Sequence, residues 1–170
     1  MAWARKIVFL SKDRQLKTYI DGLAGTIFLL LDPSDIERFD VLQELQRPYS
    51  YCLLSGAAKE AAGASAPYLL EWGRLQSALV PHFLTYLEQG AGVVVTSQLE
   101  PERLKRRLKM FLYEDGDPDG IFQKFYLATN FEFFLRTNAD FWRIFREINL
   151  AVYRQFYEPE DYVALTSEEG

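Results

Sequence analysis

The sequence is poor in the residues from which many catalytic and metal sites are built. Its 170 residues include one cysteine and one histidine. Cys52 has no partner for an internal disulfide, and it stands inside the apolar run Tyr51 to Leu54, so a buried hydrophobic role is expected. His82 has no second histidine or cysteine at metal-ligand spacing, which favours a structural role.

Excess positive charge and long hydrophobic runs are also missing. The formal net charge is -5, whereas nucleic-acid-binding proteins usually have a basic excess or a segregated basic face. The apolar run Ile7 to Leu10 is too short for a secretory signal. No segment approaches the roughly 18 consecutive apolar residues of a membrane span. We therefore expect a cytoplasmic protein with neither nucleic acid nor membrane as a partner.

The sequence contains no familiar catalytic or cofactor motif. There is no Gly-x-Ser-x-Gly elbow and no Walker loop, and the pair Gly90 and Gly92 lacks the third glycine of a dinucleotide fingerprint. We expect a protein that is not an enzyme and binds no cofactor or small-molecule ligand. The alternative is a small hydrolase-like enzyme whose carboxylates meet only after folding, and a deep pocket lined by Asp32, Glu71 or His82 would support it.

One acidic turn has the first half of a calcium-binding loop. Asp115, Asp117 and Asp119 alternate along the chain before Gly120, but the bidentate glutamate expected at the twelfth position is Tyr126. Aspartate and glycine are also common turn formers. A plain turn is therefore favoured over a metal site, with calcium as the alternative.

The segment from Gly90 to Leu127 shows the clearest pattern. Val93 to Val95 is a β-branched run typical of a buried strand, and Pro101 is suited to the first position of a helix. The residues that follow predict a strand over Met110 to Tyr113, a turn, and a second strand over Ile121 to Leu127. This segment therefore predicts strand, helix and β-hairpin.

Helical and strand patterns alternate along most of the chain. Helices are predicted over residues 12–23, 33–45, 74–89, 130–136 and 139–148, and strands over 26–31, 50–54 and 150–158. The helix that begins at Pro33 has an apolar stripe of Ile36, Phe39, Leu42 and Leu45. The helix over 74–89 is expected to kink at Pro81. The segment 56–66 is compatible with a short helix or a loop.

This alternation predicts an α/β fold with a single mixed sheet and flanking helices. The sheet is expected to be largely parallel, with an antiparallel hairpin near residues 110–127 at one edge. Residues 1–135 are predicted to form the α/β domain. Residues 136–170 are predicted to be an aromatic-rich C-terminal extension of helix and strand packed on that domain, or a small lobe.

Several short segments match the pattern of one known family. They are TIFLLLDP (26–33), APYL (66–69), GVVVTS (92–97), RLKRRLKMFLY (103–113), DPDG (117–120) and KFYLATN (124–130). In these segments the chain resembles the type VI secretion effector adaptor and chaperone family, the Tap or VasW-like proteins. Two departures are that the helix has no histidine, and that Leu127 and Ala128 stand where the family pattern has Asp and Pro.

The resemblance covers roughly residues 26–135 and implies a function. It implies a non-catalytic adaptor or chaperone that binds a secreted effector in the bacterial cytoplasm and helps to load it onto the spike protein of the secretion system. An immunity-like protein that binds the catalytic domain of a toxin is a further alternative.

Two surfaces are candidates for partner binding. Half of the aromatic residues lie between Ile121 and Tyr162, and they serve either as core or as an interface rich in the Trp, Tyr and Arg that anchor complexes. The candidates in this region are Phe131, Phe134, Phe141, Trp142, Arg143, Arg146, Tyr153 and Tyr157. The basic helix contributes Arg103, Arg106 and Arg107 as a secondary contact, although a solvated outer face is the favoured interpretation of that helix.

Overall fold

The computed structural model describes residues 3–8, 10, 13–114, 117, 122–145, 147–156 and 161–167. Its strands are β1 (Trp3–Val8), β2 (Thr26–Leu31), β3 (Ser50–Cys52), β4 (Tyr68–Glu71), β5 (Gly92–Ser97), β6 (Ile148–Arg154) and β7 (Tyr162–Ser167). Its α-helices are α1 (Asp13–Asp21), α2 (Phe39–Glu44), α3 (Gly56–Ala62), α4 (Val80–Glu88), α5 (Pro101–Lys109), α6 (Ala128–Thr137) and α7 (Ala139–Phe145). Two short 3-10 helices span Gly63–Ser65 and Trp72–Arg74.

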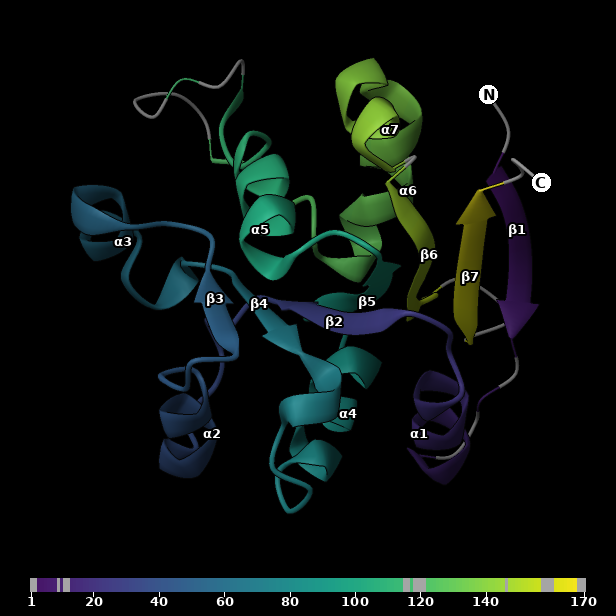
Figure 1. Cartoon of the computed structure of the whole chain (residues 1–170), viewed down its shortest axis with the longest axis horizontal. Coiled ribbons are helices and arrows are strands. Elements are labelled where there is room, and N and C mark those ends of the chain that lie inside the picture. The colour runs from purple at the N-terminus through teal and green to yellow at the C-terminus, as the bar shows by residue number, and fades with distance from the viewer. Residues whose placement is uncertain are drawn as a thin grey trace.

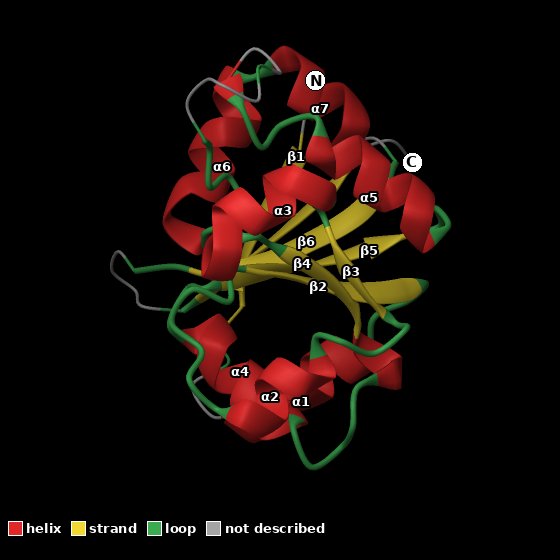
Figure 2. Ribbon diagram, turned by 90° about the vertical axis from the view of Figure 1, so that its left-hand side faces the viewer, coloured by secondary structure: helices red, strands yellow, loops and turns green. Residues whose placement is uncertain are grey.

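The described strands form one sheet that lies between two layers of helices (Figure 1). Helices α1, α2 and α4 cover one face, and α3, α5, α6 and α7 cover the other, as the rotated view in Figure 2 also shows. The strand order is β1-β7-β6-β5-β2-β4-β3. The α/β class with a single sheet and flanking helices is therefore confirmed.

The central strands are apolar on both sides because helices cover both sides. In β2, Phe28 to Leu31 are buried, and in β5 every residue from Gly92 to Ser97 is buried. Burying large aliphatic side chains contributes about 1.5–3 kcal/mol each relative to exposure. The continuous apolar runs that predicted these two strands are thus the centre of the core.

The prediction of a largely parallel sheet is wrong, because every pairing between the described strands is antiparallel. Two strands that are joined by a long helical connection can pair in either the parallel or the antiparallel sense. The connection from β5 to β6 carries α5, α6 and α7, yet β6 returns beside β5 in the antiparallel sense. Alternation of helix and strand therefore gave the right class and the wrong strand direction.

The predicted hairpin near residues 110–127 is also wrong. Helix α5 ends at Lys109 and is followed by turns, and a single isolated bridge joins Tyr113 to Phe122. Among the described strands, the hairpin with the short connection is β6–β7. Strands β1 and β7 were not predicted, although Tyr162 to Leu165 is an apolar run in which every residue is buried.

Two helices begin later than the sequence pattern suggested. The Asp32 side chain accepts hydrogen bonds from the backbone N–H and hydroxyl of Ser34, which stabilises a turn, and α2 starts at Phe39. The predicted stripe is wrong in part, since Phe39 and Leu42 are exposed. Pro81 does not kink a long helix; it lies in the first turn of α4, where proline is tolerated.

The C-terminal part of the chain joins the sheet. Strands β6 and β7 lie between β5 and β1, and the boundary predicted at residue 135 falls inside α6. The first and last described strands, β1 and β7, pair along their length from Trp3 opposite Ser167 to Val8 opposite Tyr162.

Candidate functional site

A cleft runs along α6 and the end of β6, and it consists of two adjoining hollows. The first encloses about 640 Å³ and the second about 440 Å³. The first is lined by Arg5, Ala128, Thr129, Glu132, Phe133, Arg136, Tyr153, Arg154, Gln155 and Phe156. The second is lined by Asp32, Ser34, Asp35, Ile36, Tyr86, Gln89, Gly90, Ala91, Lys124, Leu127, Thr129 and Phe156. Thr129 and Phe156 belong to both, so we refer to the two hollows together as the α6 cleft.

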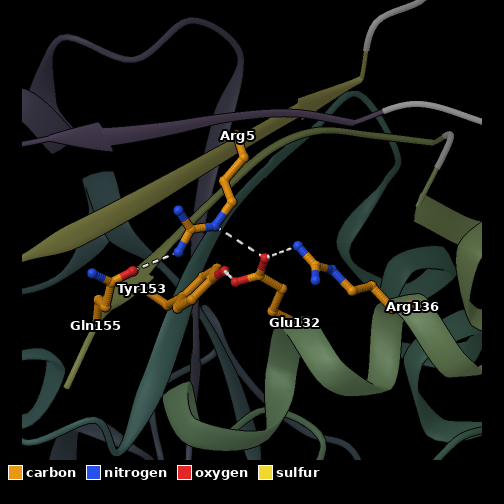
Figure 3. A network of polar contacts seen from close by, with 5 residues as sticks. All are labelled: Arg5, Glu132, Arg136, Tyr153 and Gln155. Carbon is orange, nitrogen blue, oxygen red and sulfur yellow. Dashed lines mark hydrogen bonds and ion pairs between the residues drawn. The ribbon is translucent and has the colours of Figure 1, made fainter. Parts of the chain in front are cut away.

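A network of polar contacts joins five residues that line the first hollow (Figure 3). The Glu132 Oε1 atom accepts from Arg5 Nε at 3.0 Å and from a terminal nitrogen of Arg136 at 2.6 Å. Its Oε2 atom accepts from the Tyr153 hydroxyl at 2.6 Å, and Arg5 donates a further hydrogen bond to Gln155. The Glu132 carboxylate on α6 therefore connects β1 and β6, and Arg5 extends the network to Gln155, which follows β6.

Burial of Tyr153 keeps its hydroxyl protonated. Desolvation is the main reason that the pKa of Tyr153 is raised, and the neighbouring Glu132 carboxylate raises it further. The hydroxyl therefore remains a hydrogen-bond donor to Glu132 throughout the physiological range. This donor fixes the orientation of the carboxylate that the two arginines share.

The second hollow is organised by an ion pair between the turn after β2 and the segment before α6. Lys124 Nζ lies 2.9 Å from Asp32 Oδ2 and 3.3 Å from the Ser34 hydroxyl, while Asp32 Oδ1 accepts from the Ser34 backbone N–H at 3.0 Å. Asp32 is buried and Lys124 is partly exposed. Two segments that carry the family resemblance, 26–33 and 124–130, are joined by this pair.

Replacing Lys124 with methionine should destabilise the fold by about 1–3 kcal/mol, because the buried Asp32 carboxylate would lose its charged partner. The matched control is Arg143→Met. The ion pair of Arg143 with Asp140 is exposed on both sides and should contribute less than about 1 kcal/mol. Urea denaturation measures the free energy of unfolding of both variants. Equal losses would show that the buried Asp32–Lys124 pair stabilises the fold no more than an exposed ion pair does.

The structure places three of the predicted aromatic candidates in the core. Phe131, Phe141 and Tyr153 are buried, and Phe134 packs partly buried against them. The Phe141 ring centroid lies 5.0 Å from that of Phe111 and 4.8 Å from that of Phe134. Burial removes these rings from the surface, so the aromatic density that suggested an interface is mainly packing. Arg143 is exposed, whereas Arg146, Tyr157 and the side chain of Trp142 lie outside the described part of the chain.

The basic helix α5 presents a solvated face, as the favoured interpretation expected. Arg103 and Arg106 are exposed, and Arg107 pairs with Glu147 at 3.3 Å. Its apolar side chains Leu104 and Leu108 are buried. None of these arginines lines the α6 cleft.

Of the residues that line the first hollow, the sequence analysis named Tyr153 as a candidate and missed the others. Arg5 comes from a strand that was not predicted, and it meets Glu132 only because β1 is part of the sheet. The one local signal was the four-residue spacing of Glu132 and Arg136, which is common on exposed helix faces. Among the described side chains of the aromatic-rich segment between Ile121 and Tyr162, Phe133 and Phe156 are exposed, at 72% and 41%.

The remaining candidates are Cys52, the possible calcium loop and Asp32. Cys52 is buried, and no cluster of His, Cys, Asp and Glu suited to a metal ion occurs in the described ranges. Asp115, Asp119 and Gly120 of the possible calcium loop lie outside those ranges. The enzyme alternative predicted a deep pocket lined by Asp32, Glu71 or His82. Asp32 does line the second hollow, but that hollow is open to the surface. Both carboxylate oxygens of Asp32 accept hydrogen bonds, one from Ser34 and the other from Lys124.

Fold and cleft together define an α/β protein with an antiparallel seven-stranded sheet and an open cleft with charged and aromatic walls. Residues 27–140 match the family described as a domain of unknown function, DUF4123, and the chain belongs to this family. The family is associated with type VI secretion effector adaptors. No curated protein and no solved structure matches the chain. Among the described helices, none has the length and apolar character needed to cross a membrane.

Proposed function

We propose that the protein is a non-catalytic adaptor of a type VI secretion system that binds an effector in the cytoplasm and helps to load it onto the spike protein. The family membership supports the secretion context. The observation that carries the binding role is the α6 cleft, whose two hollows share Thr129 and Phe156 and whose lining includes the exposed Phe133 and Phe156. Exposed apolar side chains framed by polar groups are typical of protein interaction surfaces.

The shape of the cleft supports a polypeptide partner. Both hollows are open to the surface, and the residues that line them come from α6, from β1 and the end of β6, and from the segments that follow β2 and α4. Such a groove can bury alternate side chains of an extended or helical segment. Phe133 and Phe156 would supply the apolar anchors, since aromatic side chains contribute most of the energy in many interfaces.

Affinity purification of the tagged protein from its source bacterium, with the secretion system active, tests this function. The expected result is an effector or spike protein recovered in stoichiometric amount and bound outside its catalytic domain. Deleting the gene should abolish export of that effector while other substrates are still exported. Recovery of the protein alone, or binding to the catalytic domain of a toxin, would refute the adaptor function.

A matched pair of surface variants tests the cleft as the docking site. Phe133→Ser should lower affinity for the recovered effector at least fivefold, because an anchor of an interface typically contributes more than about 1 kcal/mol. Phe39→Ser removes a ring of the same exposure, 73% against 72%, that lines neither hollow. Isothermal titration should show an unchanged affinity for Phe39→Ser, and equal losses in both variants would exclude the cleft.

A further inference from the structure

The first hollow of the α6 cleft has an excess of positive charge that the whole chain does not share. Among the described residues that line it, the guanidinium groups of Arg5 and Arg136 face one carboxylate, that of Glu132. The chain as a whole carries a formal charge of -5. Since the excess is local, it favours a ligand with a few negative charges at one place.

Glu132 positions these two guanidinium groups and leaves most of their donors unused. The described contacts engage two N–H groups of Arg5, toward Glu132 and Gln155, and one of Arg136. A guanidinium carries five N–H donors. The remaining donors are suited to a further carboxylate, which arginine binds in a bidentate manner.

The same geometry disfavours a cationic ligand. The Glu132 Oε1 atom already accepts from Arg5 and Arg136, and Oε2 accepts from the buried Tyr153 hydroxyl. A lysine or arginine of a partner would have to displace one of these donors. Arg136 itself is mostly exposed, so an approaching anion meets it without first opening the fold.

Apolar contact is available beside the charged groups. Phe133 and Phe156 are exposed on the walls of the same hollow. The Phe156 ring lies against Gly90, where a Cβ atom would come within 3.0 Å of the ring, so the missing side chain leaves room for it. The first hollow therefore combines arginine donors and aromatic faces in its lining.

We infer that the α6 cleft recognises an acidic segment of its protein partner, with a carboxylate between Arg5 and Arg136 and an apolar side chain against Phe133 or Phe156. This inference rests on the proposed adaptor function and names the chemistry of the segment that the adaptor binds. A long polyanion such as nucleic acid is disfavoured, because the net negative charge of the chain repels it.

Titration of the isotope-labelled full chain with short blocked peptides tests the inference by NMR. The probes are a peptide of alternating Asp and Phe, the same peptide with Asn in place of Asp, and the same peptide with Lys. The Asp peptide should shift amide signals of residues 128–136 and 153–156 and bind at least tenfold more tightly than the Asn peptide. Its affinity should fall as salt is added, because salt screens the ion pairs.

Variants distinguish binding by the arginines of the cleft from binding by the basic helix α5. Arg136→Gln should weaken binding of the Asp peptide at least fivefold, and Arg5→Gln with Arg136→Gln should abolish it. Arg136 is exposed, so the single variant remains folded even if loss of Arg5 loosens β1. The matched control, Arg103→Gln with Arg106→Gln on α5, should bind as the wild type does, since neither arginine lines the cleft.

Each contrary outcome has a distinct meaning. Equal binding of the Asn peptide, or equal loss in the α5 control, would overturn the acidic-segment inference while an effector recovered by copurification still supports the adaptor function. Stronger shifts of the same residues with a short DNA duplex or inorganic phosphate would replace the carboxylate by a phosphate ligand and also overturn it. A protein that binds the Asp peptide but recovers no effector would contradict the adaptor function alone.

Discussion

Gly92→Ala is expected to remove most of the stability of the fold. Gly92 begins β5 and pairs with Leu31 of β2 at the centre of the sheet. A Cβ atom at this position would lie within 3.0 Å of the Leu30 carbonyl oxygen, closer than real Cβ atoms approach. The obstacle is backbone of a central strand, which cannot rotate away as a side chain would, so we expect a loss of about 3 kcal/mol or more.

Gly73→Ala is the matched control for this prediction. A Cβ at Gly73 would meet no atom within 4 Å, and its φ lies outside the left-handed region. The change should alter stability by less than about 0.5 kcal/mol. Urea denaturation followed by tryptophan fluorescence compares the two, and similar midpoints would mean that β2 and β5 can separate more easily than their pairing suggests.

Phe141→Ala is the second change with a large expected effect, a loss of about 3–5 kcal/mol. The ring is fully buried and lies edge-on to Phe111, Phe125 and Phe134, with centroids 4.8–5.0 Å apart. Deleting it opens a cavity at the point where α7 and α6 pack over the residues after α5. Edge-to-face contacts add about 0.5–1.5 kcal/mol per pair beyond burial.

Phe133→Ala tests whether the loss of stability expected for Phe141→Ala comes from the burial of the ring or from its aromatic character. Phe133 is on α6 and is 72% exposed. Its removal should change the free energy of unfolding by less than about 0.5 kcal/mol, as measured by the same denaturation experiment. If Phe133→Ala destabilised the protein as much as Phe141→Ala, the assignment of Phe141 to the core would be wrong.

The sequence predicted best the elements that depend on a local pattern of residues. The apolar runs Thr26 to Leu31 and Val93 to Val95 identified the two central strands, and Pro101 marked the first residue of α5. These signals are local, because burial on both faces and a missing N–H act on the segment itself.

Neither the strand direction nor the cleft could be predicted from local patterns of this kind. Whether β6 returns parallel or antiparallel to β5 depends on the path of the 50 or so residues between them, and no local pattern records that path. The contact of Arg5 with Glu132 joins residues 127 positions apart. Charge and aromatic content predicted a partner surface, but only the packing separates buried Phe141 from exposed Phe133.

The family match and the cleft overlap only in part. The matched residues 27–140 include Glu132, Phe133 and Arg136, together with the Asp32–Lys124 pair. Arg5, Tyr153 and Phe156 lie outside that range. Half of the walls of the first hollow are therefore built from segments that the family model does not describe.

The pairing of β1 with β7 sets the time at which the first hollow of the α6 cleft can be completed. During synthesis β1 is made about 150 residues before its partner strand β7. At about 5–20 residues per second, this interval lasts roughly 8–30 s. Arg5 reaches Glu132 only when β7 has joined the sheet, so the cleft stays incomplete until β7 has been made.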